Sequence, residues 1–244
     1  MIKEIMIFNY SKKLPYEEAE AWYLQKHVHL VKELPHLIKY VNYRALDLPK
    51  NDFFPSPEFF CMEELWWPNK ASFLKAQASE EKRRVLEDLN EGPKLTDIKR
   101  VLLEKETNVL RPEMTGSFQL TMNELDGKPH VKSLWPINYL RGLSLEEAEE
   151  WYLNHHTLLA ARNFNLVRYV TYRTVAGPGA DEHDFPRFTE LCWRDWETIL
   201  NDFQSPRGLE VLEDNKNEDG EWRVVTESSF LKFPHVVGYQ RVFI

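Results

Sequence analysis

The chain has 244 residues and a formal net charge of −8, from 31 basic and 39 acidic side chains. An acidic surface repels phosphate backbones and no segment forms a basic run, so nucleic acid is not an expected partner. No apolar run approaches the roughly 18 residues of a membrane span, and the N-terminal apolar run is too short for a signal sequence. The composition predicts a soluble, cytoplasmic protein with a small-molecule partner and no membrane partner.

The first elements are a strand, an amphipathic helix and a second strand. Residues 2–9 are short, β-branched and apolar, which predicts a strand. Apolar residues then recur every three or four positions over residues 15–35, as in a helix with one buried face. Residues 37–45 read as the second strand, and its period of two places Tyr40 and Arg44 on the same face.

The rest of the first half alternates loop, strand and helix. We expect a proline-rich loop over 47–57, a strand over 58–67, one or two helices over 69–90 that restart near Ser79, a fourth strand over 97–110 and a possible extra strand over 117–125. The turn-forming residues 126–129 are the best linker candidate.

The stretch 14–44 occurs a second time at 143–173, with a constant offset of 129 and no gap. Of its 31 pairs, 15 are identical, and agreement of scarce residue types at fixed spacing indicates a tandem duplication. We therefore predict two domains of similar size, 1–125 and 130–244. The identical pairs include Trp22/Trp151, Tyr23/Tyr152, His27/His156, Tyr40/Tyr169, Tyr43/Tyr172 and Arg44/Arg173.

The second half is expected to repeat the order of the first. Its helix starts at Ser144 with Glu147 three residues on, a capping-box pattern. The offset of 129 extends to Trp67/Trp196 and is 126 at Ser79/Ser205, which places a three-residue deletion in the second helical region. The expected strands are 130–140, 166–175, 186–194 and 221–233, with 236–244 matching the extra strand.

Each half thus has the order β-α-β-β-α-β of a ferredoxin-like unit, in the α+β class. Such a unit covers one sheet face with helices, yet these strands carry large residues on both faces. The two sheets can cover each other, which predicts two ferredoxin-like repeats forming an intramolecular dimeric α+β barrel. Assembly into a further homodimer stays open.

The pattern Trp-Tyr-x3-His, followed by leucine, proline and tyrosine, resembles the EthD-type branch of the dimeric α+β barrel superfamily. The second copy has Phe164 in place of the proline. The matching residues are Trp22, His27, Leu30, Pro35 and Tyr40 in the first copy and Trp151, His156, Leu159 and Tyr169 in the second.

The resemblance implies a ligand cavity in each half, between the sheet and its helices, with the helix histidine facing it. Some relatives are cofactor-free enzymes that act on small cyclic or aromatic compounds, such as lactone isomerases and polyketide-type dehydratases. The wider superfamily includes quinone-forming monooxygenases and haem-binding members.

The candidate catalytic residues are duplicated. A partly buried imidazole is a competent acid or base near neutral pH, which favours His27 and His156, although core histidines with satisfied rings are the structural alternative. Tyr40 and Tyr169 could polarise a substrate oxygen. The candidate substrate-binding residues are Trp22, Trp151, Tyr23, Tyr152, Arg44 and Arg173; each arginine could equally pair with an acid at a strand end.

No metal-binding pattern and no phosphate-binding glycine loop is present, so no metal and no cofactor is expected. Cys61 and Cys192 lie in apolar segments and read as buried thiols. The sequence predicts a cofactor-free enzyme that acts by acid/base proton transfer, either a lyase such as a dehydratase or an isomerase. Its predicted substrate is a small apolar cyclic or aromatic metabolite of a degradation or secondary-metabolic pathway. The alternatives are a haem-binding or oxygen-using monooxygenase and a non-catalytic ligand-binding protein.

Overall fold

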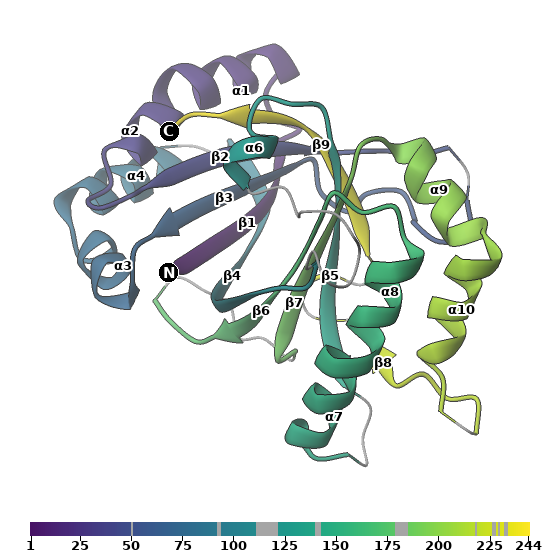
Figure 1. The fold of residues 1–244 in the computed structure, drawn as a ribbon. Coiled ribbons are helices and arrows are strands. Elements are labelled where there is room, and N and C mark those ends of the chain that lie inside the picture. The colour runs from purple at the N-terminus through teal and green to yellow at the C-terminus, as the bar shows by residue number, and fades with distance from the viewer. Residues whose placement is uncertain are drawn as a thin grey trace.

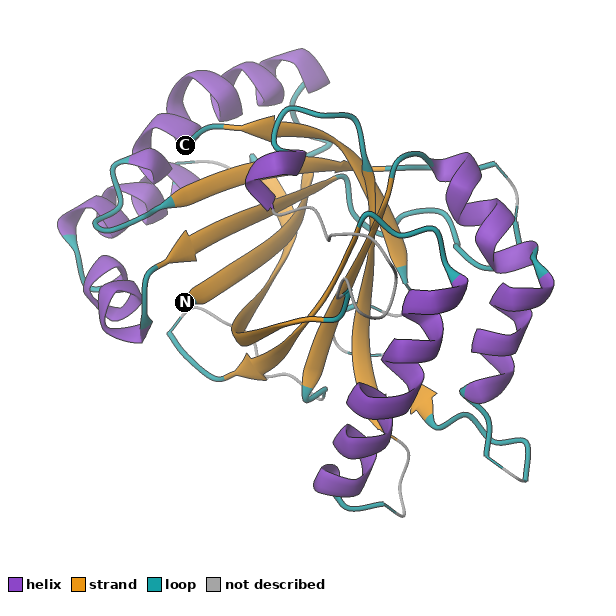
Figure 2. Ribbon diagram, viewed as in Figure 1, coloured by secondary structure: helices purple, strands orange, loops and turns teal. Residues whose placement is uncertain are grey.

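The computed structural model describes residues 1–49, 51–91, 94–110, 122–139, 143–178, 185–217, 219–225, 228, 230–231 and 234–244. Strands occupy the centre of the molecule and helices lie around them (Figure 2). Helices α1 to α4 lie on one side of the strands, and α7 to α10 lie on the other (Figure 1).

The elements follow the duplicated order. The first half contains β1 (Ile2–Tyr10), α1 (Tyr16–Trp22), the π-helical turn η1 (Tyr23–His27), α2 (Val28–Lys32), β2 (Lys39–Ala45), β3 (Cys61–Trp67), α3 (Lys70–Gln77), α4 (Glu80–Asn90) and β4 (Leu95–Asn108). After α6 (Met122–Leu125), the second half contains β5 (Val131–Tyr139), α7 (Leu145–Trp151), the π-helical turn η2 (Tyr152–His156), α8 (Thr157–Asn163), β6 (Arg168–Val175), β7 (Arg187–Trp193), α9 (Trp196–Gln204), α10 (Pro206–Asp214), β8 (Val224–Val225) and β9 (His235–Val242).

Polar side chains begin the helices where the sequence predicted them. Ser144 and Glu147 form the complete capping box of α7. Ser79 caps α4 and confirms the expected restart after α3, and Ser205 caps α10 in the same way. These side chains accept backbone N–H groups that the first helical turn leaves without a partner.

The strands form one closed barrel. Their order is β7-β6-β4-β1-β3-β2-β9-β5, and β5 pairs with β7 to complete the ring. Each half contributes four neighbouring strands, and the halves meet at two antiparallel junctions, β2 with β9 and β4 with β6. A closed ring removes the exposed sheet edges. The predicted intramolecular α+β barrel is confirmed.

The fourth strand of the second half differs from the prediction. β9 pairs with β5 and β2 as β4 pairs with β1 and β6, so β9 is the fourth strand and not an extra one. Among the described residues of the expected strand 221–233, β8 alone pairs with β5. In the first half, the extra strand expected over 117–125 lies outside the described residues up to 121, and its end belongs to helix α6.

The three-residue deletion also lies elsewhere. Lys3 pairs with Trp66, and its counterpart Lys132 pairs with Cys192, so the offset is already 126 in the third strand. Trp67 therefore corresponds to Trp193 and not to Trp196. The deletion falls in the loop before the third strand. A loop tolerates a change in length better than a strand that is paired on both sides.

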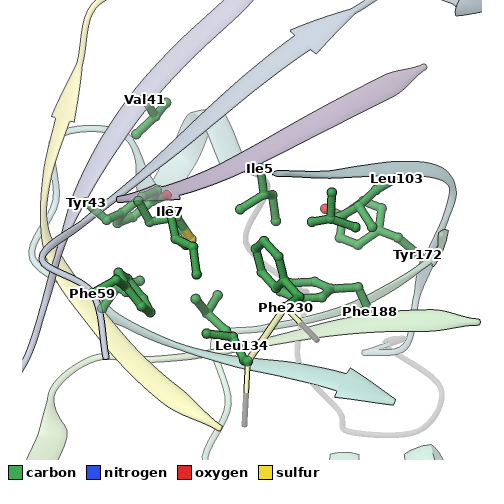
Figure 3. Close-up of a cluster of buried hydrophobic side chains, with 14 of the residues drawn as sticks. Ile5, Ile7, Val41, Tyr43, Phe59, Leu103, Leu134, Tyr172, Phe188 and Phe230 are labelled. Atoms are coloured by element: carbon green, nitrogen blue, oxygen red, sulfur yellow. The ribbon is translucent and has the colours of Figure 1, made fainter. Parts of the chain in front are cut away.

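A hydrophobic cluster fills the barrel (Figure 3). Tyr43 and Tyr172 both lie in it, on the opposite strand faces from Tyr40 and Tyr169. Phe230 and Leu231, from the segment between β8 and β9, are buried in the same cluster. The free thiols Cys61 and Cys192 are buried, as expected.

Four buried charges link the two halves. Lys3 contacts Glu64 at 2.9 Å and also pairs with Glu190, while Lys132 contacts Glu64 at 2.5 Å and Glu190 at 3.4 Å. Burial alone would raise the pKa of Glu64, but the two lysines outweigh it and lower that pKa to about 2. The Glu64 carboxylate therefore stays ionised near neutral pH. Within the described ranges, no helix has the length and apolar character needed to cross a membrane.

Candidate functional site

The two predicted histidines each end a π-helical turn. In both copies the turn starts at the tyrosine of the Trp-Tyr-x3-His pattern, at Tyr23 or Tyr152. The wider turn stacks the two rings: Tyr152 and His156 have centroids 5.6 Å apart and planes inclined by 25°. Short π-helical insertions inside α-helices are frequent at functional sites.

Each histidine lies within hydrogen-bonding distance of an aspartate near the C-terminal end of a helix, α4 in the first half and α10 in the second. His156 Nδ1 lies 2.9 Å from Asp214 Oδ2, and His27 Nδ1 lies 3.0 Å from Asp88 Oδ2. Asp88 and Asp214 correspond at the offset of 126. The duplication therefore preserved a His–Asp pair, which leaves Nε2 of each ring available for other contacts.

The residue before each histidine also contacts the aspartate. Lys26 lies 2.8 Å from Asp88, and its counterpart His155 lies 2.7 Å from Asp214. Burial alone would raise the pKa of Asp214, but hydrogen bonds with His156 and His155 outweigh it and lower the pKa. The Asp214 carboxylate therefore stays ionised beside the two imidazole rings.

The second half contains a cavity of about 470 Å³. It lies between the sheet and the helices η2, α8 and α10, and Asp52 and Phe53 from the loop of the first half also line it. His156 lines this cavity together with Tyr152 and Tyr169. Most of its other lining residues are apolar or aromatic: Trp135, Ile137, Ala160, Phe164, Leu191, Phe203, Val211, Leu212, Trp222, Val224 and Pro234.

The corresponding space in the first half is almost closed. The cavity beside His27 has a volume of about 20 Å³, and charged residues line it: Glu4, Glu63, Lys82 and Arg100. Its small volume leaves room for about one water molecule. The structure thus shows which copy keeps an open site, a question that the sequence alone left open.

Three substitutions replace charged residues of the closed site with small neutral ones. By the strand register, Glu4 corresponds to Ser133 and Glu63 to Thr189, so small neutral residues replace two acids in the second half. The third change is from a lysine in α4 to a glycine in α10. Lys82 and Gly208 each donate their backbone N–H to the helix-capping serine, which establishes that they correspond.

The tyrosines take different partners in the two halves. Tyr23 and Tyr40 both donate to Glu63, Tyr23 at 2.5 Å, which closes the first site. In the second half, Tyr152 lies 2.8 Å from Thr189. Burial raises the pKa of Tyr152 and, more strongly, that of Tyr169, so both phenols stay neutral near pH 7 and can polarise an oxygen but not accept a proton.

The remaining candidates lie outside the large cavity. Trp22 and Trp151 pack against the histidine rings, with centroids 5.1 Å from His27 and 5.3 Å from His156. They position the imidazoles and do not line the 470 Å³ space.

Both arginines form ion pairs with a duplicated glutamate of the first helix. Arg44 lies 2.5 Å from Glu20, and Arg173 lies 2.6 Å from Glu149. Neither lines the 470 Å³ cavity. Arg173 instead lines a separate hollow of about 520 Å³, together with Glu146, Glu149 and Glu150. Among the residues with described positions, no group of three or more His, Cys, Asp or Glu side chains could hold a metal ion.

Sequence reasoning missed the two aspartates and Glu63. The matching segments Val85–Leu86–Glu87–Asp88 and 211–214 carried a usable signal, since the duplication retained an acid in both. Glu63 gave no such signal, because its counterpart is Thr189. Its role as an acceptor for Tyr40 depends on the register of β2 with β3.

No family model matches the sequence, and no curated protein does. Solved structures do. An anthrone oxidase-like protein aligns over 99% of this chain and 92% of its own, with 12% identity and a TM-score of 0.58. A mutant chlorite dismutase from Candidatus Nitrospira defluvii aligns over 97% and 90%, with 15% identity and a TM-score of 0.56.

An ethyl tert-butyl ether D (EthD) family protein from Bacillus halodurans aligns over 43% of this chain and 98% of its own, with 19% identity and a TM-score of 0.36. That likeness does not support the narrower EthD assignment, which stays a prediction. The two longer alignments cover nearly all of this chain, so they include both of its halves. The chain has a dimeric α+β barrel fold, with both halves of the barrel in one chain.

Proposed function

We propose that the second half is a cofactor-independent active site that oxidises a flat, largely apolar aromatic compound with molecular oxygen. The observation that carries the proposal is the His156–Asp214 pair at the wall of a cavity lined mainly by aromatic and aliphatic side chains. The anthrone oxidase-like neighbour motivates the choice of an oxidation.

The proposed oxidation needs one general base and a site from which water is excluded. His156 Nε2 removes a proton from the acidic CH₂ group of an anthrone-like substrate, and Asp214 stabilises the imidazolium that forms. The neutral phenols Tyr152 and Tyr169 polarise the substrate's oxygen. The resulting carbanion adds O₂ to give a hydroperoxide, which loses water. One oxygen atom ends in the new carbonyl group and the other in water, so CH₂ and O₂ yield C=O and H₂O.

Haem fits this cavity poorly. A haem carries two propionates, which need cationic partners, and no lysine or arginine is among the described residues that line the cavity, whereas Asp52 is. The imidazole of His156 could serve as an axial ligand, but the described residues around it offer no cationic side chain to pair with the haem propionates.

The duplication supplies the control for a test. Purified protein is mixed with a hydroxylated anthrone, and oxygen consumption and quinone absorbance are followed. His156→Gln should lower the rate by about 10²- to 10⁴-fold, the usual contribution of a general base. His27→Gln, at the closed site, should leave the rate unchanged.

Equal losses in both variants, or none in either, would contradict the proposal. If turnover continued without oxygen, the lyase or isomerase predicted from the sequence would be favoured instead. That enzyme would use the same base.

A further inference from the structure

A carboxylate without a counter-ion lies at the mouth of the large cavity. Asp52, from the loop of the first half, lines the cavity and is exposed to solvent. It forms no hydrogen bond or ion pair with any other described residue. Trp222 also lines the cavity and is 48% exposed. The cavity therefore opens to solvent beside these two residues.

The loop that carries Asp52 is held against the second half. Asn51 Oδ1 accepts the backbone N–H groups of Phe53 and Phe54, at 3.0 and 2.6 Å. The side chain of Phe54 is buried, and its ring centroid lies 5.2 Å from that of Phe203. Because Asp52 lies between these contacts in the sequence, its charge stays beside the cavity.

The described lining residues provide no cation to offset this charge. They include no lysine and no arginine. The imidazole of His156 lies 2.9 Å from Asp214, whose negative charge balances a proton on that ring. The two lining tyrosines are neutral near pH 7, as described above. Asp52 is therefore the uncompensated charge among the described residues of the cavity wall.

Two cations lie near the rim without lining the cavity. Lys216 Nζ lies 5.4 Å from the ring centroid of Trp222 and pairs with Glu213 at 2.6 Å. Arg223 lies 5.3 Å from the ring centroid of Trp151, which is outside the cavity. The first cation is balanced by an acid, and the second contacts a ring that a ligand in the cavity does not reach.

We propose that Asp52 makes the cavity selective for charge, so that it takes neutral or cationic aromatic compounds and rejects aromatic carboxylates. An apolar wall screens charge less than water does, and it concentrates the field of a carboxylate along the path that a ligand takes. The inference rests on the proposed function for the identity of the site. It narrows the substrate class to aromatic compounds without an acidic substituent.

Binding without turnover tests the selectivity separately from the oxidation. The probes are 2-naphthoate, 2-naphthamide and 2-naphthylmethylammonium, which share one ring system and carry a negative, zero and positive charge. Calorimetric titration at pH 7.5 and about 10 mM salt keeps charges within roughly 30 Å unscreened. Asp52→Asn should tighten binding of the anion and weaken binding of the cation, each about two- to fivefold, while the neutral amide keeps its affinity.

Asp47→Asn is the matched control. Asp47 is an exposed acid of the same loop that does not line the cavity, and its Oδ1 accepts the hydroxyl of Ser56. Asparagine retains that acceptor atom, and the net charge of the protein changes by the same amount as in Asp52→Asn. The relative affinities of the three probes should stay those of the wild type, and so should turnover.

The outcomes separate the two proposals. If Asp52→Asn leaves the relative affinities unchanged, or if Asp47→Asn alters them equally, the role of Asp52 is overturned and the oxidation stands. An effect of Asp52→Asn that shrinks as salt is raised to about 0.5 M supports a charge interaction, because the screening length falls to a few ångströms. Failure of the wild type to bind 2-naphthamide overturns both proposals.

Discussion

His235 is a single buried residue that makes the stability of the fold depend on pH. It lies on β9, is 1% exposed, and neither of its ring nitrogens has a hydrogen-bond partner among the described residues. Phe59 packs edge-on against it, and Glu58 is 4.0 Å away. Burial, helped by the positive charge of Lys99, lowers the pKa of His235 to about 4.

We predict that the stability of the barrel falls on acidification because of this ring. Above about pH 6.5 the imidazole is neutral in both states and contributes nothing. As the pH falls from 6.5 to 4, the unfolded chain takes up a proton that the folded chain does not, at a total cost of about 3 kcal/mol. Below pH 4 both states are protonated and no more is lost.

Urea unfolding at a series of pH values measures this loss, with His235→Leu as the comparison. The variant should be less sensitive to pH than the wild type between 6.5 and 4. Parallel curves for the two proteins would show that the buried ring does not control the acid response.

At this scale the sequence predicted part of the site. It singled out His27 and His156 because a repeat makes rare residues conspicuous. It did not indicate which site would be closed, since closure depends on Glu4, Glu63 and Lys82, which come from three elements. Those contacts exist only once the strands are in register.

At the scale of elements, the corner between α9 and α10 is tighter than its counterpart. Helix α9 ends directly at Ser205, which also caps α10, whereas Ala78 separates α3 from the cap Ser79. The tight corner requires a glycine. A Cβ at Gly208 would lie 1.9 Å from the backbone carbonyl oxygen of Asp202.

We predict that Gly208→Ala destabilises the protein by about 1–3 kcal/mol, the usual cost of overpacking a fixed neighbour. Gly177→Ala is the matched control, because a Cβ there would meet the end of the Leu102 side chain, which can move. Thermal unfolding of the two variants measures the difference. An equal change in Tm for both would show that the corner relaxes.

The elements themselves were largely predictable, with two exceptions. The strand over 221–233 was misplaced because an apolar, aromatic segment reads like a strand, yet Phe230 and Leu231 fill the barrel instead of pairing along its wall. The π-helical turns were also missed. An amphipathic pattern fits an ordinary helix as well, and only the retained Tyr-x3-His spacing marks the wider turn.

At the scale of the whole molecule, the two halves are joined by buried charge as well as by strands. Lys132 of one half pairs with Glu64 of the other, and Lys3 with Glu190, so each half supplies one cation and one anion. Removing a single member leaves its partner charged in a medium that solvates charge poorly.

We predict that Lys132→Met destabilises the barrel by about 3–5 kcal/mol, because Glu64 loses its 2.5 Å partner. Glu64→Gln removes the carboxylate that would be left over. The double variant Lys132→Met with Glu64→Gln should therefore be more stable than the sum of the single losses. Chemical unfolding of the four proteins gives the coupling energy, and simple additivity would show that the cluster acts as independent contacts.

The covalent link between the halves changes what a substitution can do. In a barrel built from two identical chains, every replacement appears at both sites, so a lysine that closed one cavity would close the other. Here Lys82 and Gly208 occupy equivalent positions in one chain and vary independently. The first half can therefore specialise as a rigid partner that completes the ring of strands and lends Phe53 to the wall of its neighbour's cavity, while the second half keeps the open space.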